Sequence, residues 1–129
     1  EEDGQCLALA RGADAQPARI CRSHPPYAHW TRSDLDRNVG GPLLAKWGDR
    51  YLVGGRKNID PQKPRTTLYW LAGNQLQEIG QLPSGGDNSY PGFVALDRTR
   101  ALLSYYSSHE SNGAGLAPSK IYLSELTLS

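Results

Sequence analysis

The feature that most constrains the fold of this chain is a repeated pair of short apolar runs joined by a tight turn. In the first copy, Gly40-Gly41-Pro42 opens the pair and Gly48-Asp49 makes the turn. In the second copy, Pro91-Gly92 opens the pair and residues 97–100 make the turn. Pro42 and Pro91 are 49 positions apart, and a repeat of about 40–50 residues built from short strands is typical of β-propeller blades.

The lengths of the connections between the expected strands indicate that the long loops gather at one edge of the sheets. They alternate between short turns and long loops, and the longest loop is residues 23–41. Successive connections of an antiparallel meander fall on opposite edges of the sheet, so we expect the long loops to share one edge, where scaffolds often carry binding residues. The expected strands are residues 6–10, 17–22, 42–46, 50–55, 66–71, 75–79, 92–96, 101–106 and 120–128, with a bulge near Ser124-Glu125.

These patterns predict an all-β partial propeller of about two and a half four-stranded antiparallel blades, in one domain spanning residues 1–129. Residues 6–22 form a half blade, 40–79 a full blade and 87–128 a closing blade. An open arc would leave apolar faces and strand edges in water. We therefore expect identical copies to close the ring as a homodimer or higher homo-oligomer, with a piece of a longer chain as the alternative.

Composition and charge argue against two classes of partner. The chain has 129 residues, of which 38% are hydrophobic, and no apolar run approaches the roughly 18 residues of a membrane helix. Its net charge of +1 comes from interspersed charges, so no basic stripe favours nucleic acid. Scattered histidines and the lack of a Cys-x-x-Cys motif predict no metal or other cofactor. The sequence does not indicate a cellular compartment.

The two cysteines lie on the first expected hairpin. Cys6 and Cys21 are equally far from the turn at Ala13-Asp14, so we expect them opposite each other on neighbouring strands. Such a pair has two interpretations, either two small buried thiols or a strained disulfide.

Two strings are the most distinctive in the chain, Gly86-Asp87-Asn88-Ser89-Tyr90-Pro91-Gly92 and Ser104-Tyr105-Tyr106-Ser107-Ser108-His109-Glu110. They follow, in the chain, the strings Cys21-Arg22-Ser23-His24-Pro25-Pro26-Tyr27 and Gly54-Gly55-Arg56, and they precede Ile121-Tyr122-Leu123. In this order the strings resemble the closing blades of sialidase-like (BNR-repeat-like) six-bladed β-propellers. The resemblance covers most of residues 20–128.

The resemblance implies a carbohydrate site on the long-loop face. Sialidases use a Tyr nucleophile, an Asp acid/base and three Arg residues that bind the substrate carboxylate. Tyr90 matches the Tyr by its position before the innermost strand of the last blade, and Asp87 is the candidate acid/base. The candidate ligand-binding residues are Arg22, Tyr27, Arg56, His109 and Glu110.

The arginine triad and the Ser-x-Asp-x-Gly-x-Thr-Trp box are incomplete in this sequence. Three functional hypotheses follow. The first is a propeller that binds or cleaves glycans, the second is a non-catalytic interaction module that self-associates, and the third is a structural remnant without a ligand. In the first hypothesis the mouth of the site is formed by Arg56, Asp87, Tyr90, His109 and Glu110.

Each candidate residue also has a structural interpretation. Tyr90 can pack against the adjacent blade, and Asp87 can cap its own loop. His109 and Glu110 can pair with each other or with Arg56. The remaining candidates can brace backbone carbonyls, as Arg22 and Arg56 would, or cover the core, as Tyr27 would.

Overall fold

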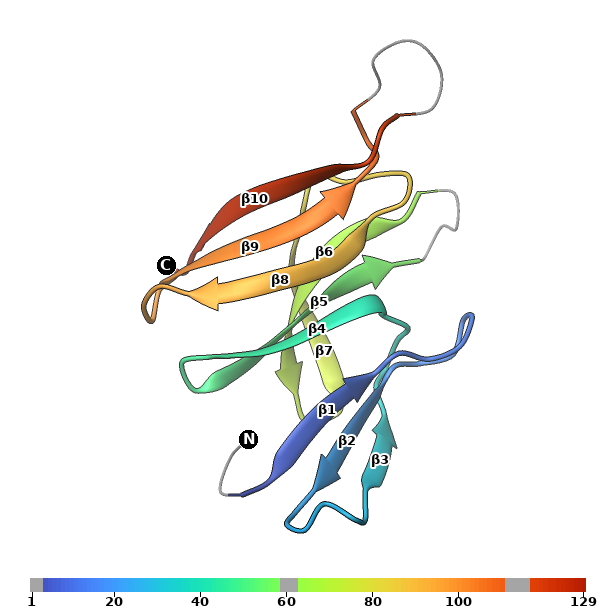
Figure 1. Ribbon diagram of the computed structural model, residues 1–129, viewed down its shortest axis with the longest axis vertical. Helices are drawn as coiled ribbons and strands as arrows, with labels where there is room; N and C mark the ends of the chain where they lie inside the picture. Colours follow the sequence, from blue (N-terminus) through green and yellow to red (C-terminus); the bar gives the residue numbers. More distant parts are fainter. Residues whose placement is uncertain (1–3, 59–62, 111–116) are drawn as a thin grey trace.

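The chain folds into three small antiparallel sheets (Figure 1). The computed structural model describes residues 4–58, 63–110 and 117–129, and within these ranges it contains ten strands and no helix, hence none that could cross a membrane. The first sheet consists of β1 (Cys6–Ala10), β2 (Arg19–Ser23) and β3 (Thr31–Asp34); the second of β4 (Gly40–Trp47), β5 (Arg50–Lys57), β6 (Arg65–Ala72) and β7 (Gln75–Gln81); the third of β8 (Ser89–Ala95), β9 (Arg100–Ser107) and β10 (Lys120–Thr127). The all-β prediction is confirmed.

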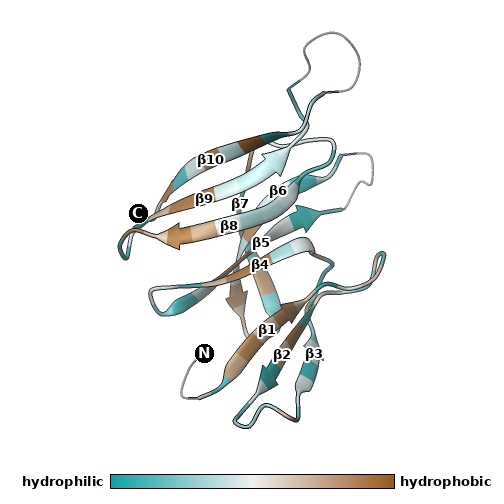
Figure 2. Ribbon diagram, viewed as in Figure 1, coloured by the Kyte–Doolittle hydropathy of each residue, from teal (hydrophilic) through white to brown (hydrophobic). Residues whose placement is uncertain are grey.

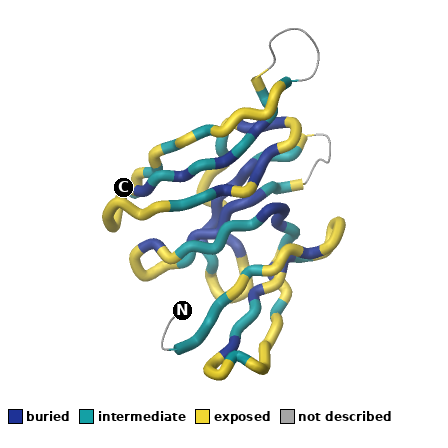
Figure 3. The backbone as a smooth tube through the Cα atoms, viewed as in Figure 1, coloured by how far each residue is buried: buried dark blue, intermediate teal, exposed yellow. Residues whose placement is uncertain are grey.

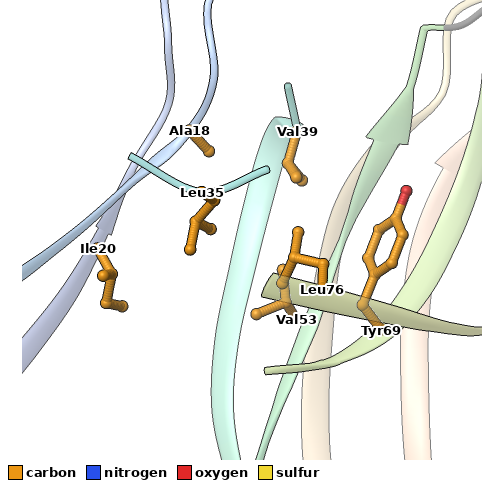
Figure 4. Packing of buried hydrophobic residues seen from close by; sticks show 7 residues of the cluster. All are labelled: Ala18, Ile20, Leu35, Val39, Val53, Tyr69 and Leu76. Atoms are coloured by element: carbon orange, nitrogen blue, oxygen red, sulfur yellow. The ribbon is translucent and has the colours of Figure 1, made fainter. Parts of the chain in front are cut away.

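The two central strands of the second sheet, β5 and β6, are buried on both faces (Figure 3). Because side chains alternate along a strand, Val53 and Tyr69 face the first sheet, where they pack in a cluster with Ile20 (Figure 4). Leu52 belongs to a second cluster with Leu103 of the third sheet. Burying one such aliphatic side chain contributes about 1.5–3 kcal/mol. The apolar residues on both faces of these strands therefore hold the three sheets together.

The sequence analysis did not predict one strand, β3. β3 pairs with β2 in antiparallel register, with Arg19 opposite Asp34 and Cys21 opposite Arg32. Its sequence, Thr31-Arg32-Ser33-Asp34, has no apolar residue that would signal a strand. The expectation of a single long loop over residues 23–41 is therefore wrong.

The extra strand changes which edge each loop occupies. β5, β7 and β9 end at one edge and β6, β8 and β10 begin there, as expected, and we call this the long-loop edge (Figure 1). The β2–β3 loop, residues 24–30, lies instead at the opposite edge, because one additional strand reverses the direction of the chain.

Two further details of register differ from expectation. β10 pairs with β9 in unbroken register from Lys120 to Thr127, so there is no bulge near Ser124-Glu125. Cys6 lies opposite Ser23, and Cys21 lies opposite Ala8. The two cysteines are thus offset by two positions rather than directly opposed, and both are free thiols of intermediate exposure.

β4 and β8, the first strands of the second and third sheets, lie against each other. Both strands have a register shift where they meet the long-loop edge, between Gly40 and Leu43 and between Ser89 and Gly92. The buried Ser89 hydroxyl lies 2.7 Å from the Gly40 carbonyl oxygen and 3.0 Å from that of Gly41, and it shares its proton between them. This contact fixes how the two sheets meet beside the long loops.

Gly41 should not tolerate a side chain. It has a φ of +53°, and a Cβ atom there would lie 2.8 Å from Ser89 Oγ. We expect Gly41→Ala to lower the free energy of unfolding by about 2–4 kcal/mol, because positive φ costs an alanine about 1–2 kcal/mol and the Ser89 hydrogen bonds are disturbed as well. Urea unfolding followed by tryptophan fluorescence measures this loss.

Gly48→Ala is the matched control. Gly48 has a φ of +66°, but no atom lies within 4 Å of a Cβ built there. It should therefore lose only the conformational part, about 1–2 kcal/mol. Equal losses in the two variants would show that the Ser89 contact contributes nothing.

Candidate functional site

Tyr90 is an exposed aromatic side chain at the long-loop edge. It is the second residue of β8 and lies in the left-handed region, with a φ of +49°, and the residue is 62% exposed. Its ring stacks on that of Tyr106 from β9, with centroids 6.1 Å apart and an interplanar angle of 18°. A non-glycine residue with positive φ costs about 1–3 kcal/mol and persists only where its surroundings enforce it. The bulge in β8 thus presents a flat aromatic surface to solvent.

Polar groups beside this ring form a chain of contacts. The Tyr106 hydroxyl donates a hydrogen bond of 2.8 Å to Asp87 Oδ1. Arg56, at the end of β5, lies 3.3 Å from the same carboxylate oxygen through Nη2. Its Nε donates a 2.7 Å hydrogen bond to the Asn88 carbonyl oxygen. The structure therefore brings together three of the predicted residues, Arg56, Asp87 and Tyr90, and adds Tyr106.

The loop that carries Asp87 is held by buried hydrogen bonds. Asn88 is fully buried, and its Oδ1 accepts a 2.7 Å hydrogen bond from Thr66 Oγ1. Its Nδ2 donates to the carbonyl oxygens of Pro64 and Gly86, at 3.1 and 2.9 Å. A buried amide with both ends satisfied fixes the loop in one conformation. Asp87 is exposed, but its two neighbours in the chain are held in place, because Asn88 is buried and hydrogen-bonded and its Nδ2 also bonds the carbonyl oxygen of Gly86.

The electrostatics of the cluster keep Tyr106 protonated. Burial raises the pKa of the Tyr106 phenol above its ordinary value, and the hydrogen bond to Asp87 and the charge of that carboxylate raise it further. Arg56 opposes this effect without cancelling it. The phenol is therefore a hydrogen-bond donor at neutral pH, not a phenolate.

His109 and Glu110 are not part of this cluster. The His109 ring lies 4.9 Å from that of Tyr122, and its Nδ1 is 2.7 Å from Ser107 Oγ. Tyr122 stacks on Tyr105, which points to the opposite face of the third sheet from Tyr106 because the two are sequence neighbours on one strand. Glu110 pairs instead with Lys120 at 3.1 Å. The expected pairing of either residue with Arg56 is not found.

Arg22 and Tyr27 lie still farther from the cluster. Arg22 is near the end of β2 and Tyr27 is in the β2–β3 loop, so both lie at the edge opposite the long loops. The expectation that they share a site with Arg56 is wrong, because it treated residues 23–41 as a single loop and missed β3.

The sequence prediction missed Tyr106 and Asn88, and each left a signal that could have identified it. The Tyr105-Tyr106 pair falls on a strand, so one of the two rings must leave the core. Asn88 follows Gly85-Gly86-Asp87, and Asx side chains commonly stabilise such loops. Among the described residues, no group of three or more His, Cys, Asp or Glu side chains could hold a metal ion.

Comparisons with known proteins define the fold but not the chemistry. No family model matches the sequence, and no curated protein matches it. A solved structure, described as a protein of unknown function from Dyadobacter fermentans DSM 18053, aligns with a TM-score of 0.76 at 25% sequence identity. The alignment covers 99% of this chain and 36% of that chain, so this chain spans about a third of its length.

The raised pKa of Tyr106 predicts a loss of stability in alkali. Burial also raises the pKa values of Tyr69 and Tyr105. Above pH ~10 the unfolded chain releases phenol protons that the folded chain still holds, so the free energy of unfolding falls as the pH rises. Tyr106→Phe removes one of these groups and should make the fall above about pH 10 shallower than in the wild type. Urea unfolding at a series of pH values tests this, and parallel curves for the two proteins would contradict it.

Proposed function

We propose that this chain is a carbohydrate-binding module with the blade arrangement of sialidase-like propellers, and that the sugar binds on Tyr90 without being hydrolysed. The observation that carries the proposal is the exposed Tyr90 ring stacked on Tyr106, whose hydroxyl is held by Asp87. Ligand sites combine aromatic surfaces with a few fixed polar groups. The apolar face of a sugar ring matches the Tyr90 ring, and its hydroxyl groups match the Asp87 carboxylate and the Arg56 guanidinium.

The propeller arrangement is supported by the order of the sheets. Three antiparallel sheets follow one another along the chain, and their strands are ordered as in the sequence. The first strands of the second and third sheets, β4 and β8, are in contact, as the innermost strands of adjacent blades would be. The sheets are then two three-stranded blades on either side of one four-stranded blade.

Binding without hydrolysis fits the cluster better than catalysis. A nucleophilic phenol needs a lowered pKa or an adjacent base. The phenol bonded to the carboxylate is Tyr106, whose pKa is raised. Asp87 is already bonded to Tyr106 and Arg56, whereas Glu110 pairs with Lys120 elsewhere. Neither carboxylate is placed as the free acid of a hydrolase.

An apolar surface on the third sheet supports the further proposal that a second copy of the chain binds there. The pairing of β8 with β9 and of β9 with β10 places Val94, Ile121 and Leu123 on the same face of this sheet. They are 61%, 84% and 69% exposed, and Figure 2 shows apolar stretches on β8 and β10. We call these three residues the apolar patch.

The apolar patch can form the centre of a symmetric dimer interface. Its three side chains are each more than half exposed on one face of the sheet, and exposed apolar patches mark interaction sites. A stable dimer buries about 800 Å² on each partner, of which roughly 65% is apolar. Two copies related by a two-fold axis would each cover the patch of the other.

Substitution of Tyr90 tests the carbohydrate proposal. We expect Tyr90→Ala to weaken saccharide binding roughly tenfold, because loss of a stacking ring and its contact area costs about 1–1.5 kcal/mol. Tyr90→Phe should keep binding, because the stacked ring remains. Isothermal titration with ligands chosen from a glycan array, including sialic acid and neutral sugars, measures both variants.

Trp30→Ala is the matched control for that experiment, because Trp30 is another exposed aromatic residue but lies at the opposite edge. It should bind saccharides as the wild type does. Binding that survives Tyr90→Ala, or an array with no saccharide bound, would contradict the proposal, and turnover lost in Tyr90→Phe would show a hydrolase instead.

The apolar patch predicts a dimer that a charge disrupts. Wild-type protein should sediment with the mass of two copies, and Leu123→Lys should sediment as one copy, because a buried unpaired ammonium group is strongly unfavourable. Gln77→Lys, on the exposed strand β7, adds the same charge away from the patch and should remain dimeric. A wild-type monomer at micromolar concentration would contradict this proposal.

A further inference from the structure

A cavity lies at the edge opposite the long loops, away from the Tyr90 cluster. It is open to solvent and has a volume of about 400 Å³ between the beginning of β1, the end of β2 and the β2–β3 loop. Its polar lining comes from Gln5, Arg22, Ser23, His24, His29 and Thr31. This volume is within the range of small-molecule sites.

The loop that forms this cavity is fixed by its own hydrogen bonds. The buried Ser23 hydroxyl donates a 2.5 Å hydrogen bond to the His29 carbonyl oxygen, and the Tyr27 amide donates one of 2.7 Å to that of His24. Trp30 Nε1 donates to the Tyr27 carbonyl oxygen at 3.1 Å. Tyr27 in turn donates from its hydroxyl to the Gly4 carbonyl oxygen at 2.9 Å, which ties the loop to the residues before β1. The cavity is therefore preformed.

Arg22 is the charged residue among the described residues that line the cavity. None of these described lining residues is a carboxylate, and within the same part of the chain the Arg22 guanidinium has no ion pair or hydrogen bond. Arg22 is nevertheless half-buried. The other described arginines of intermediate exposure each have a partner. Arg37 and Arg56 pair with carboxylates, and Arg65 donates a hydrogen bond to the Pro64 carbonyl oxygen, whereas Arg32 is exposed.

A partly buried guanidinium without a protein partner keeps its donors available to an anion. The planar guanidinium carries five donors that match a carboxylate or phosphate group through two parallel hydrogen bonds. Around it, the imidazoles of His24 and His29 and the amide of Gln5 can each donate a hydrogen bond to the same group. Gln5 Nε2 and His24 Nε2 already lie 3.4 Å apart, so both reach the same part of the cavity.

We propose that this cavity binds an oxyanion, the phosphate or carboxylate group of a small molecule, with Arg22 as the residue that holds its charge. The site shares no residue with the Tyr90 cluster and does not depend on carbohydrate binding. A nucleic acid does not fit, because the cavity takes one anionic group and the chain has a net charge of only +1.

The three histidines of the chain allow a direct test by NMR. His24 and His29 line the cavity, whereas His109 packs on Tyr122 at the other edge and serves as an internal reference. Titration with inorganic phosphate at constant pH and ionic strength should shift the ring signals of His24 and His29 in a saturable manner and leave those of His109 unchanged. A parallel titration with acetate distinguishes a phosphate site from a carboxylate site, and either result supports an oxyanion site.

Variants then assign the charge to Arg22. Arg22→Gln should raise the apparent dissociation constant at least tenfold, and Arg22→Lys should fall between Arg22→Gln and the wild type, because it keeps the charge but loses the fork. Arg32→Gln is the matched control, since Arg32 is on the neighbouring strand of the same sheet but is exposed and lies outside the lining. It should bind phosphate as the wild type does.

Unchanged His109 signals in Arg22→Gln would show that this variant is folded. The proposal is overturned if neither anion shifts His24 and His29, if all three histidines shift together, or if Arg22→Gln binds as tightly as the wild type. Should Arg22→Gln fail to fold, Arg22→Lys decides the matter, because wild-type affinity in that variant would exclude recognition by the guanidinium fork.

Discussion

The contact between β4 and β8 is the constraint on which the candidate site depends. There, the Ser89 hydroxyl shares its proton between two carbonyl oxygens of the opposing strand, at 2.7 and 3.0 Å. A side chain at Gly41 would occupy the position of that hydroxyl. Because Ser89 is fixed, Asn88 reaches Thr66 and the loop before it lies over the end of β5. Arg56 and Asp87, which are 31 positions apart, meet beside this contact, where Arg56 also donates a hydrogen bond to the Asn88 carbonyl oxygen.

The second general property of the molecule is that the polar groups of its two candidate sites lie at opposite edges, while the buried apolar core lies between sheets. The central strands of the middle sheet, β5 and β6, are buried on both faces and contribute to both clusters of the core. The backbone at the strand ends is free of these packing demands, so loops there can carry exposed aromatic and charged groups. Tyr90 at one edge and Arg22 at the other are both examples.

Much of the fold could be predicted from the sequence, and the failures have physical causes. Strands such as β5 and β6 are rich in apolar and β-branched residues, and all nine expected strands are present. β3 was missed because a strand with one solvent-exposed face and polar residues throughout is specified by pairing with β2, not by its own side chains. Because β3 was not predicted, Arg22 and Tyr27 were expected at the wrong edge of the sheets. His109 was misplaced because residues after a strand can fold to either face of the sheet.

The sequence by itself determined the all-β class, the tight turns and the grouping of Asp87 and Tyr90, because these follow from local residue preferences and from chain connectivity. Only the tertiary structure decided that Tyr106 joins them and that Arg56 meets Asp87. It also decided that Arg22, which has no ion pair within the described residues, lies in a cavity at the opposite edge. Those outcomes depend on which face a side chain occupies and on how many strands precede it. A change of one residue in register or of one strand in number reverses them, and no local pattern in the chain encodes that count.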